Sequence, residues 1–305
     1  MIERWKLHVA KTALRERLPL RRQARQLKRR LRGYEPDPSN IGSTLEDLAR
    51  LAAVMGRRGL RFHGTVLEIG AGWFPLAGIL VRTLGAERVL LADIEPHMDA
   101  TTFRAARATA LSRTDRIAEL FGIAADSVRQ LLATAESPSD IGLEYRAPFD
   151  LSAIPNGSVD IVMSRACLEH IPVPDLRRLM ADLRPKLAPD GIMAHAIDHG
   201  DHLAYADRSI NRLHFLTWSE ARHKIVWRLM KGGENGLRDG EFARLFADAG
   251  YEVLASEGEV HEPTLRGIGR LQFRPPYDGM APEELATLTS WFVLRPSGAR
   301  GEPAP

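Results

Sequence analysis

The sequence predicts an α/β protein with a doubly wound, mostly parallel sheet. Short apolar runs alternate with helical patterns along most of the 305-residue chain. Parallel neighbours need crossover connections, and the intervening helical patterns supply them. The chain ends differently, on two strand patterns with no obvious crossover helix between them, which predicts a hairpin-like end. We expect seven strands, helical insertions and a basic N-terminal arm.

The elements follow from local patterns. Ser43 and Glu46 have the spacing of a capping box and precede leucines at helical spacing, so a helix is expected to begin at residue 43. Strands are predicted over 65–70, 88–94, 143–150, 159–166, 191–198, 251–260 and 289–296. Helices are predicted over 75–85, 174–189 and 240–250, and over much of two insertions, 97–142 and 203–238.

Charge divides the chain. Residues 1–32 carry a net charge of +10, although the whole chain carries only +3. We expect a basic arm and linker over 1–42, a main domain over 43–297 and a disordered tail over 298–305. The arm is either a phosphate-tracking or membrane-surface element, or a solvated helix with its leucines on the body and its arginines in water. Those leucines are Leu14, Leu18, Leu27 and Leu31.

Other bulk features predict a cytoplasmic protein. No apolar run approaches the ~20 residues that cross a membrane, and the N-terminus does not resemble a secretory signal. Cys167 is the single cysteine, which excludes an internal disulfide.

The turn after the first strand, "LEIGAGWFP", predicts a nucleotide site, because ligands of doubly wound sheets lie beyond the carboxyl ends of the strands. A pyrophosphate is disfavoured, since Pro75 lacks an N–H donor and Glu68 brings negative charge. S-adenosylmethionine, which has a sulfonium, an ammonium and no phosphate, suits the turn better. Asp93, 21 residues beyond Gly72, is placed to accept hydrogen bonds from ribose hydroxyls.

These segments resemble the class I S-adenosylmethionine-dependent methyltransferases, whose first motif is E/D-x-G-x-G-x-G; here Phe74 replaces the third glycine. The resemblance covers about residues 43–200 and includes "FDLSAIPNGSVDIVMSRACLEHI". It implies a Rossmann-like methyltransferase fold, with Asp150 reading adenine and Ser164 and Arg165 near the reactive end of the cofactor. The implied cofactor residues are Glu68, Gly70, Ala71, Gly72, Trp73, Asp93, Ile94, Asp150, Leu151, Ser164 and Arg165. A narrower resemblance is to bacterial methyltransferase-domain proteins of polysaccharide or natural-product assembly.

The stretch "HAIDHGDH" (195–202) is the richest source of a base at the end of the fifth predicted strand. Candidate catalytic residues are His199, Asp198 and His202, with His170 after the fourth strand as a further candidate. Acceptor binding, a divalent metal site and simple loop capping are the competing interpretations. We expect no metal, because few carboxylates accompany the histidines. His195 and His199 are expected to share one face of the strand.

The second insertion is expected to shape the acceptor pocket, because it mixes aromatic and polar side chains. Its candidate residues are Asn211, Arg212, His214, Phe215, Trp218, Trp227, Asn235 and Arg238. The predicted function is methyl transfer, by in-line displacement, to a hydroxyl or amine of a small polar metabolite, a sugar or a natural-product intermediate. The alternatives are an RNA-directed methyltransferase that uses residues 1–33, and a catalytically idle scaffold.

Overall fold

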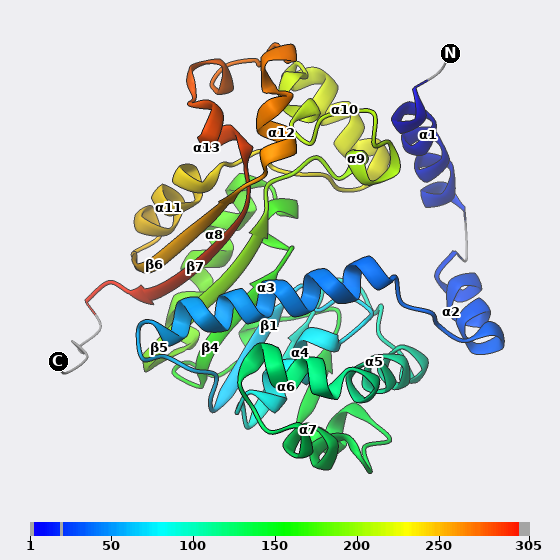
Figure 1. The fold of residues 1–305 in the computed structure, drawn as a ribbon, viewed down its shortest axis with the longest axis vertical. Coiled ribbons are helices and arrows are strands. Elements are labelled where there is room, and N and C mark those ends of the chain that lie inside the picture. Colours follow the sequence, from blue (N-terminus) through cyan, green and yellow to red (C-terminus); the bar gives the residue numbers. More distant parts are fainter. Residues whose placement is uncertain (1–2, 19–20, 299–305) are drawn as a thin grey trace.

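One seven-stranded sheet forms the centre of the protein, in a computed structural model that describes residues 3–18 and 21–298 (Figure 1). The strand order is β3-β2-β1-β4-β5-β7-β6, and β7 runs antiparallel to both neighbours while the other pairings are parallel. The predicted doubly wound fold and its hairpin-like end are confirmed. The strands are β1 Thr65–Ile69, β2 Arg88–Ala92, β3 Leu143–Arg146, β4 Val159–Arg165, β5 Leu187–Asp198, β6 Tyr251–Val260 and β7 Thr287–Pro296. Of the predicted tail, residues 299–305 lie outside the described part.

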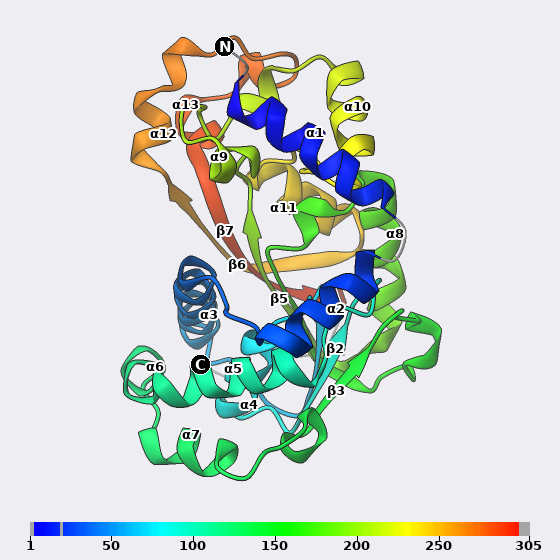
Figure 2. The same cartoon turned by 90° about the vertical axis from the view of Figure 1, so that its right-hand side faces the viewer.

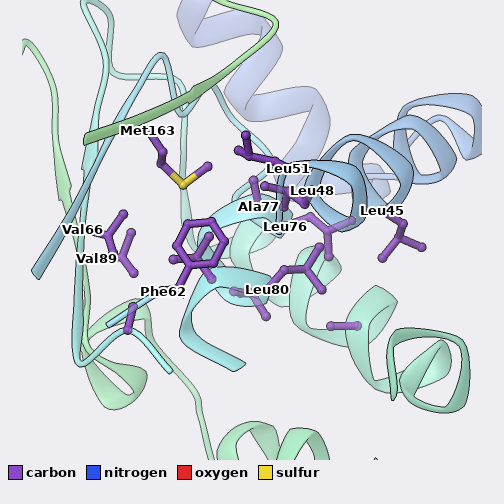
Figure 3. Packing of buried hydrophobic residues seen from close by; sticks show 14 of the residues in the cluster. Leu45, Leu48, Leu51, Phe62, Val66, Leu76, Ala77, Leu80, Val89 and Met163 are labelled. Atoms are coloured by element: carbon purple, nitrogen blue, oxygen red, sulfur yellow. The ribbon is translucent and has the colours of Figure 1, made fainter. Parts of the chain in front are cut away.

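Helices cover both faces of the sheet. On one face α3 and α4 pack on β1, β2 and β4 through side chains such as Leu48, Leu80, Val66, Val89 and Met163 (Figure 3). The other face is covered by α8 and α11. The helices are α1 Arg4–Arg17, α2 Arg21–Arg32, α3 Pro38–Gly56, α4 Leu76–Thr83, α5 Ala100–Ser112, α6 Thr114–Phe121, α7 Ala125–Leu132, α8 Val173–Leu183, α9 Leu203–Ala206, α10 Glu220–Met230, α11 Asp239–Asp248, α12 Glu262–Arg266 and α13 Pro282–Ala286. The first insertion is thus largely helical, as α5 to α7.

A third apolar cluster joins the start of the chain to the second insertion. In α1, Trp5 and Val9 are buried with Phe215, Trp218 and other residues of the 203–238 insertion. The Trp5 and Trp218 rings are stacked with their centroids 5.4 Å apart, and the backbone N–H of Trp5 donates to Asp207 Oδ2 at 3.0 Å. Figure 2 shows α1 lying across α9 and α10. This part of the arm therefore belongs to the folded body.

The predicted start of the helix at residue 43 is wrong. Helix α3 already begins at Pro38, and Asp37 rather than Ser43 caps it, accepting a hydrogen bond from the Ser39 N–H at 2.9 Å. A proline in the first turn suits a helix start, because its missing N–H has no helical partner to lose. Ser43 lies inside the helix, so the predicted capping box with Glu46 does not form.

One of the two interpretations of the arm, in which its leucines pack on the body, does not describe the structure. Leu14, Leu18, Leu27 and Leu31 are between 55% and 76% exposed, whereas Arg29 is only 8% exposed. The apolar contacts of α1 come from Trp5 and Val9 instead, because these lie on the side facing the insertion. Across residues 3–18 and 21–298, no helix is both long and apolar enough to span a membrane.

The turn after β1 depends on glycine. Gly70 has φ +78°, and a Cβ there would overlap the Sγ of Cys167 and lie 2.8 Å from its Cβ. Gly72 has φ +64°, but a Cβ at that position would meet nothing within 4 Å. Gly70 therefore permits the chain after β4 to lie directly against the turn.

We expect Gly70→Ala to destabilise the protein more than Gly72→Ala. Both substitutions carry the left-handed backbone cost of about 1–2 kcal/mol, but only Gly70→Ala adds a steric overlap. Urea denaturation of both variants and the wild type gives the free energies of unfolding. Equal losses for the two variants would contradict the close packing of Cys167 on the turn.

Candidate active site

The ends of β1, β4 and β5 place three charged residues on the α3 side of the sheet. The strands are adjacent and parallel, and alternation along each one directs Glu68, Arg165 and Asp198 to that side. Arg165 is anchored to α3, since its Nε lies 2.9 Å from Asp47 Oδ2 and its Nη2 lies 2.7 Å from Ser43 Oγ. The predicted residues Glu68, Arg165 and Asp198 thus share one edge of the fold.

Because side chains alternate between the two faces of a strand, other predicted site residues are buried on the opposite side of the sheet, against α8 and α11. Ser164 Oγ lies 2.8 Å from His195 Nδ1, and both residues are fully buried. His199 is on the same face, as expected, with its Nδ1 3.0 Å from Leu237 O and its Nε2 2.9 Å from Ser290 Oγ. Burial lowers the pKa of His195 and of His199 to about 3. These contacts contradict the predictions that His199 is a base and that Ser164 faces the cofactor, because both side chains are committed inside the fold.

Asp93 ties the glycine turn to the end of β2. Its Oδ2 accepts from the Gly72 N–H at 2.8 Å and its Oδ1 from the Glu95 N–H at 3.0 Å. Each carboxylate oxygen can accept a further hydrogen bond, so ribose hydroxyls still find acceptors here. Ile94, next in the chain, is 85% exposed and offers an apolar surface beside this carboxylate.

Glu68 is a buried acid without a hydrogen bond to its Oε2. Burial raises its pKa to about 7, although the nearby positive charge of Arg165 opposes this change. A buried carboxylate without a partner is unfavourable, and a cationic ligand would relieve it. Glu68 thus fits the ammonium end of S-adenosylmethionine.

The loop with Asp150 and Leu151 lies next to Asp93, because the Phe149 N–H donates to the Asp93 backbone carbonyl at 2.9 Å. Asp150 is exposed and accepts from the N–H and hydroxyl of Ser152 at 2.9 and 2.7 Å. The loop is thereby held at the carboxyl edge of β2, where an adenine reader is expected.

The two aromatic residues of the glycine turn have separate structural roles. Phe74 is buried in the core, where the family motif has its third glycine. Trp73 donates its indole N–H to the Tyr34 hydroxyl at 3.0 Å, and the Arg29 guanidinium lies 5.4 Å from both ring centroids. Arg29 also donates to the His97 carbonyl at 3.0 Å. Helix α2 therefore docks over the cofactor turn through Arg29, and cation–π contact favours that position.

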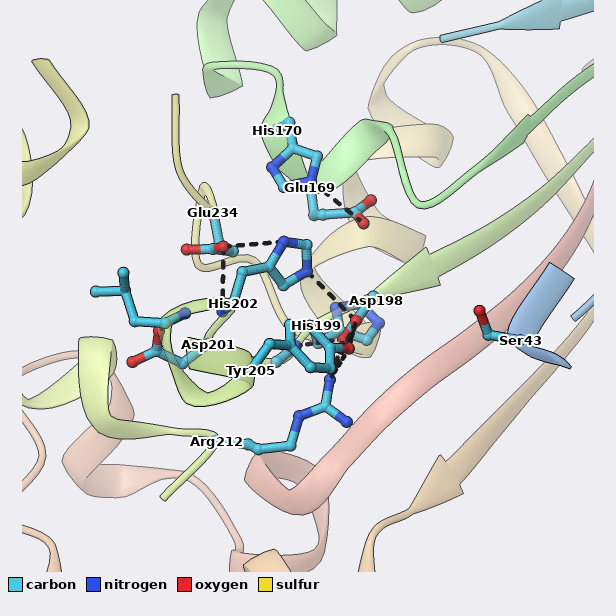
Figure 4. Close-up of polar contacts among 12 residues, drawn as sticks. Ser43, Glu169, His170, Asp198, His199, Asp201, His202, Tyr205, Arg212 and Glu234 are labelled. Carbon is cyan, nitrogen blue, oxygen red and sulfur yellow. Dashed lines mark hydrogen bonds and ion pairs between the residues drawn. The ribbon is translucent and has the colours of Figure 1, made fainter. Parts of the chain in front are cut away.

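A cluster of charged side chains lies just beyond the end of β5 (Figure 4). Asp198 accepts from Arg212 Nη2 at 3.0 Å and from the Tyr205 hydroxyl at 2.7 Å. The His202 ring lies between two carboxylates, with its Nε2 3.3 Å from Asp198 Oδ2 and its Nδ1 3.3 Å from Glu234 Oε1. Asp198 and His202, two of the candidate catalytic residues, therefore lie in one cluster.

The cluster fixes the charge states of these two residues. Burial alone would raise the pKa of Asp198, but His202 and Arg212 hold it well below its usual range. Burial alone would lower the pKa of His202, but Asp198 and Glu234 raise it to about 9. At neutral pH Asp198 is therefore a carboxylate and His202 an imidazolium.

The loop after β4 supplies Glu169 and His170 to the same cluster. The His170 and His202 rings are 4.7 Å apart in an edge-to-face arrangement. Glu169 is 1% exposed, and burial raises its pKa to about 8. Sequence reasoning selected His170 but missed Glu169, which adjoins it in "LEHI", and Glu234, which lies in a loop with no motif.

A cavity of about 110 Å³ lies beside His202 and Glu234. Trp218, Trp227 and His8 are among its lining residues, so α1 and the second insertion both contribute walls. Its aromatic walls and adjoining charges match the mixture expected for an acceptor pocket.

Most other pocket candidates of the second insertion stabilise the fold instead. Arg238 is fully buried and donates to three backbone carbonyls. Asn235 donates to the carbonyls of Leu168 and Ile171, and Asn211 to that of Thr264. Phe215 belongs to the buried cluster, and His214 packs edge-on against Trp218. Of the candidates, Arg212 bonds to the charged cluster through its side chain, and Trp218 and Trp227 line the cavity.

Comparison with known proteins identifies the family. The family model described as "Methyltransferase domain" matches residues 15–256. No curated protein gives a significant match.

Several solved structures are similar to this chain at low sequence identity. An S-adenosylmethionine-dependent methyltransferase from Mesorhizobium loti is 20% identical, with a TM-score of 0.45 over 82% of this chain and 99% of that one. A putative sarcosine dimethylglycine methyltransferase from Galdieria sulphuraria is 17% identical, with a TM-score of 0.44 over 87% and 92% of the two chains. Phosphoethanolamine N-methyltransferase 2 from Haemonchus contortus is 16% identical, with a TM-score of 0.43 over 81% and 52%. Because the family model covers most of the sequence, the chain belongs to the methyltransferase-domain family, as a class I enzyme whose cofactor is S-adenosylmethionine.

Proposed function

We propose that the enzyme methylates a hydroxyl or amine of a small polar metabolite, a sugar or a natural-product intermediate. The observation that carries this proposal is the shared edge of β1, β4 and β5. Glu68 at the glycine turn and Asp198 in the charged cluster lie on the same side of adjacent strands, with Arg165 between them. A cofactor and an acceptor held at these two points would meet in front of Arg165.

On the cofactor side, Glu68 is the candidate partner of the ammonium group and Asp93 of the ribose hydroxyls. Ile94 would pack against the adenine, since its exposed side chain adjoins Asp93. S-adenosylmethionine supplies a methyl group already activated by the sulfonium, which passes to the acceptor by in-line displacement. The main task of the protein is therefore to orient the acceptor and exclude water.

On the acceptor side, Asp198 is the candidate proton acceptor and His202 its charged partner. Asp198 is ionised, is oriented by Arg212 and Tyr205, and lies at the carboxyl end of β5. Tyr205 is 62% exposed, so the cluster borders solvent on that side. The adjoining cavity of about 110 Å³ has room for part of a small acceptor between aromatic walls.

We expect Asp198→Asn to lower turnover of a hydroxyl acceptor by at least about 100-fold, the lower range for loss of a general base. His199→Asn is the matched control, because the adjacent side chain lies on the opposite face and bonds only within the fold. This variant should have a lower melting temperature than the wild type but a turnover number close to that of the wild type. Methyl incorporation from labelled S-adenosylmethionine and thermal denaturation measure the two effects. A near-wild-type rate for Asp198→Asn would remove Asp198 as the base.

We expect cofactor binding at pH 6 to release a proton from Glu68. With its pKa raised to about 7, Glu68 is mostly protonated in the free enzyme at that pH, and a bound cation would favour its ionised form. Calorimetry in buffers of different ionisation enthalpy should show a buffer-dependent heat. Glu68→Gln should bind more weakly and lose that dependence. A wild-type heat that is the same in all buffers would contradict this role.

The RNA-directed alternative is tested by charge rather than by deletion, because α1 forms part of the cavity wall. The variant Lys11→Gln/Arg15→Gln/Lys28→Gln/Arg32→Gln changes four exposed arm positions. We expect turnover of a small acceptor to stay within about twofold, as for most surface substitutions. An RNA enzyme would instead lose affinity and show a weaker salt dependence of binding. Filter binding and turnover at several salt concentrations separate the two functions.

A further inference from the structure

Three side chains from two loops converge beyond the ends of β4 and β5. Glu169 and His170 follow β4, and His202 follows β5. One carboxylate oxygen and one nitrogen from each imidazole lie within 4.8 Å of one another (Figure 4). Two imidazoles and a carboxylate at this spacing are a donor set that divalent transition metals favour.

His170 presents an available donor atom to this point, and His202 presents a second one once it loses a proton. His170 Nδ1 lies 2.9 Å from the Gly233 carbonyl, so it carries the proton and leaves the lone pair on Nε2. His170 Nε2 lies 4.0 Å from Glu169 Oε1, too far for a hydrogen bond. Two ligands of a tetrahedral ion lie about 3.4 Å apart, so a bound ion would draw these atoms slightly closer. His202 Nδ1 faces Glu234 and its Nε2 faces Asp198, so Nε2 can bind a cation only by giving up the proton that it holds in the metal-free protein. Such carboxylate and carbonyl contacts commonly fix metal-binding imidazoles.

Glu169 provides an independent reason for a ligand here. It is 1% exposed, and neither carboxylate oxygen receives a hydrogen bond of normal geometry, although the Glu169 and Asp198 backbones lie nearby. A buried carboxylate in this condition is costly unless a cation or a proton accompanies it. The carboxylate belongs to a group that includes two imidazoles, so a divalent cation that displaces the His202 proton would interact with all three side chains together.

We propose that Glu169, His170 and His202 bind a divalent transition-metal ion. Asp198 lies beside this group and would supply a second carboxylate near the ion. The sequence predicts no metal, because few carboxylates accompany the histidines in the stretch 195–202. In the structure, Glu169 and Glu234 come from other loops and supply additional carboxylates. The consequence for catalysis rests on the proposed function. Asp198 is a weak base, and a cation beside it would lower the pKa of a bound acceptor hydroxyl.

Titration with Co²⁺ tests the site directly. Wild-type enzyme, freed of metal with a chelator, should bind one Co²⁺ per chain, with a visible absorption band and a higher melting temperature. Glu169→Gln and His170→Asn should each weaken Co²⁺ binding by at least about 100-fold, and Glu234→Gln by about 10-fold. His63→Ala is the matched control, because His63 is exposed and precedes β1 at the other end of the strands, and its Co²⁺ affinity should equal that of the wild type.

Two results would overturn the metal site. One is a wild-type enzyme whose absorption and melting temperature do not change with Co²⁺, a readout that stands even where a variant fails to fold. The other is retention of wild-type affinity by folded Glu169→Gln and His170→Asn.

Methyl incorporation measured in parallel distinguishes this inference from the proposed function. An enzyme that binds Co²⁺ but methylates no hydroxyl or amine acceptor would contradict the function and leave the site in place. An enzyme that keeps its full rate with chelator present would contradict the catalytic role of the metal and leave the function in place.

Discussion

The alternation of side chains along strands that end at one edge of the sheet is the constraint on which this site depends. Successive residues of β4 and β5 point to opposite faces, so Arg165 and Asp198 face the α3 side while Ser164 and His199 are enclosed on the other. A one-residue change in register would exchange these two groups. The pairing of β4 with β5 and of β5 with β7 therefore determines which polar residues remain available for chemistry.

Two buried acids show how the fold prepares this edge for positive charge. Glu68 and Glu169 both have a raised pKa because burial disfavours their charged forms, and each has at least one carboxylate oxygen without a hydrogen bond. Protein stability alone does not favour such groups, since apolar side chains would fill the same space at lower cost. A cationic cofactor beside Glu68 and a metal ion beside Glu169 would give both acids a function.

The basic arm is part of the enzyme rather than an appended tail. Helix α1 shares an apolar cluster with the second insertion and contributes His8 to the cavity wall. Helix α2 reaches the glycine turn through Arg29, which lies against Trp73 and Tyr34. The two helices thus connect the glycine turn with the cavity beside His202. The leucines Leu14, Leu18, Leu27 and Leu31 of this arm are exposed to solvent.

The sequence by itself determined the doubly wound fold, the glycine turn and the acids Glu68 and Asp93, because periodicity and spacing along one strand–turn–strand unit are local properties. It also predicted an acceptor region at the end of β5, where the structure places the charged cluster. Only the tertiary structure decided among the histidines: His199 is buried against α11, while His202 and His170 meet Glu169 across two loops. The separation of residues 169 and 202 along the sequence does not reveal this contact, because the pairing of β4 with β5 brings their loops together. The contacts of α1 were likewise decided by packing. Its buried residues are Trp5 and Val9 rather than the regularly spaced leucines.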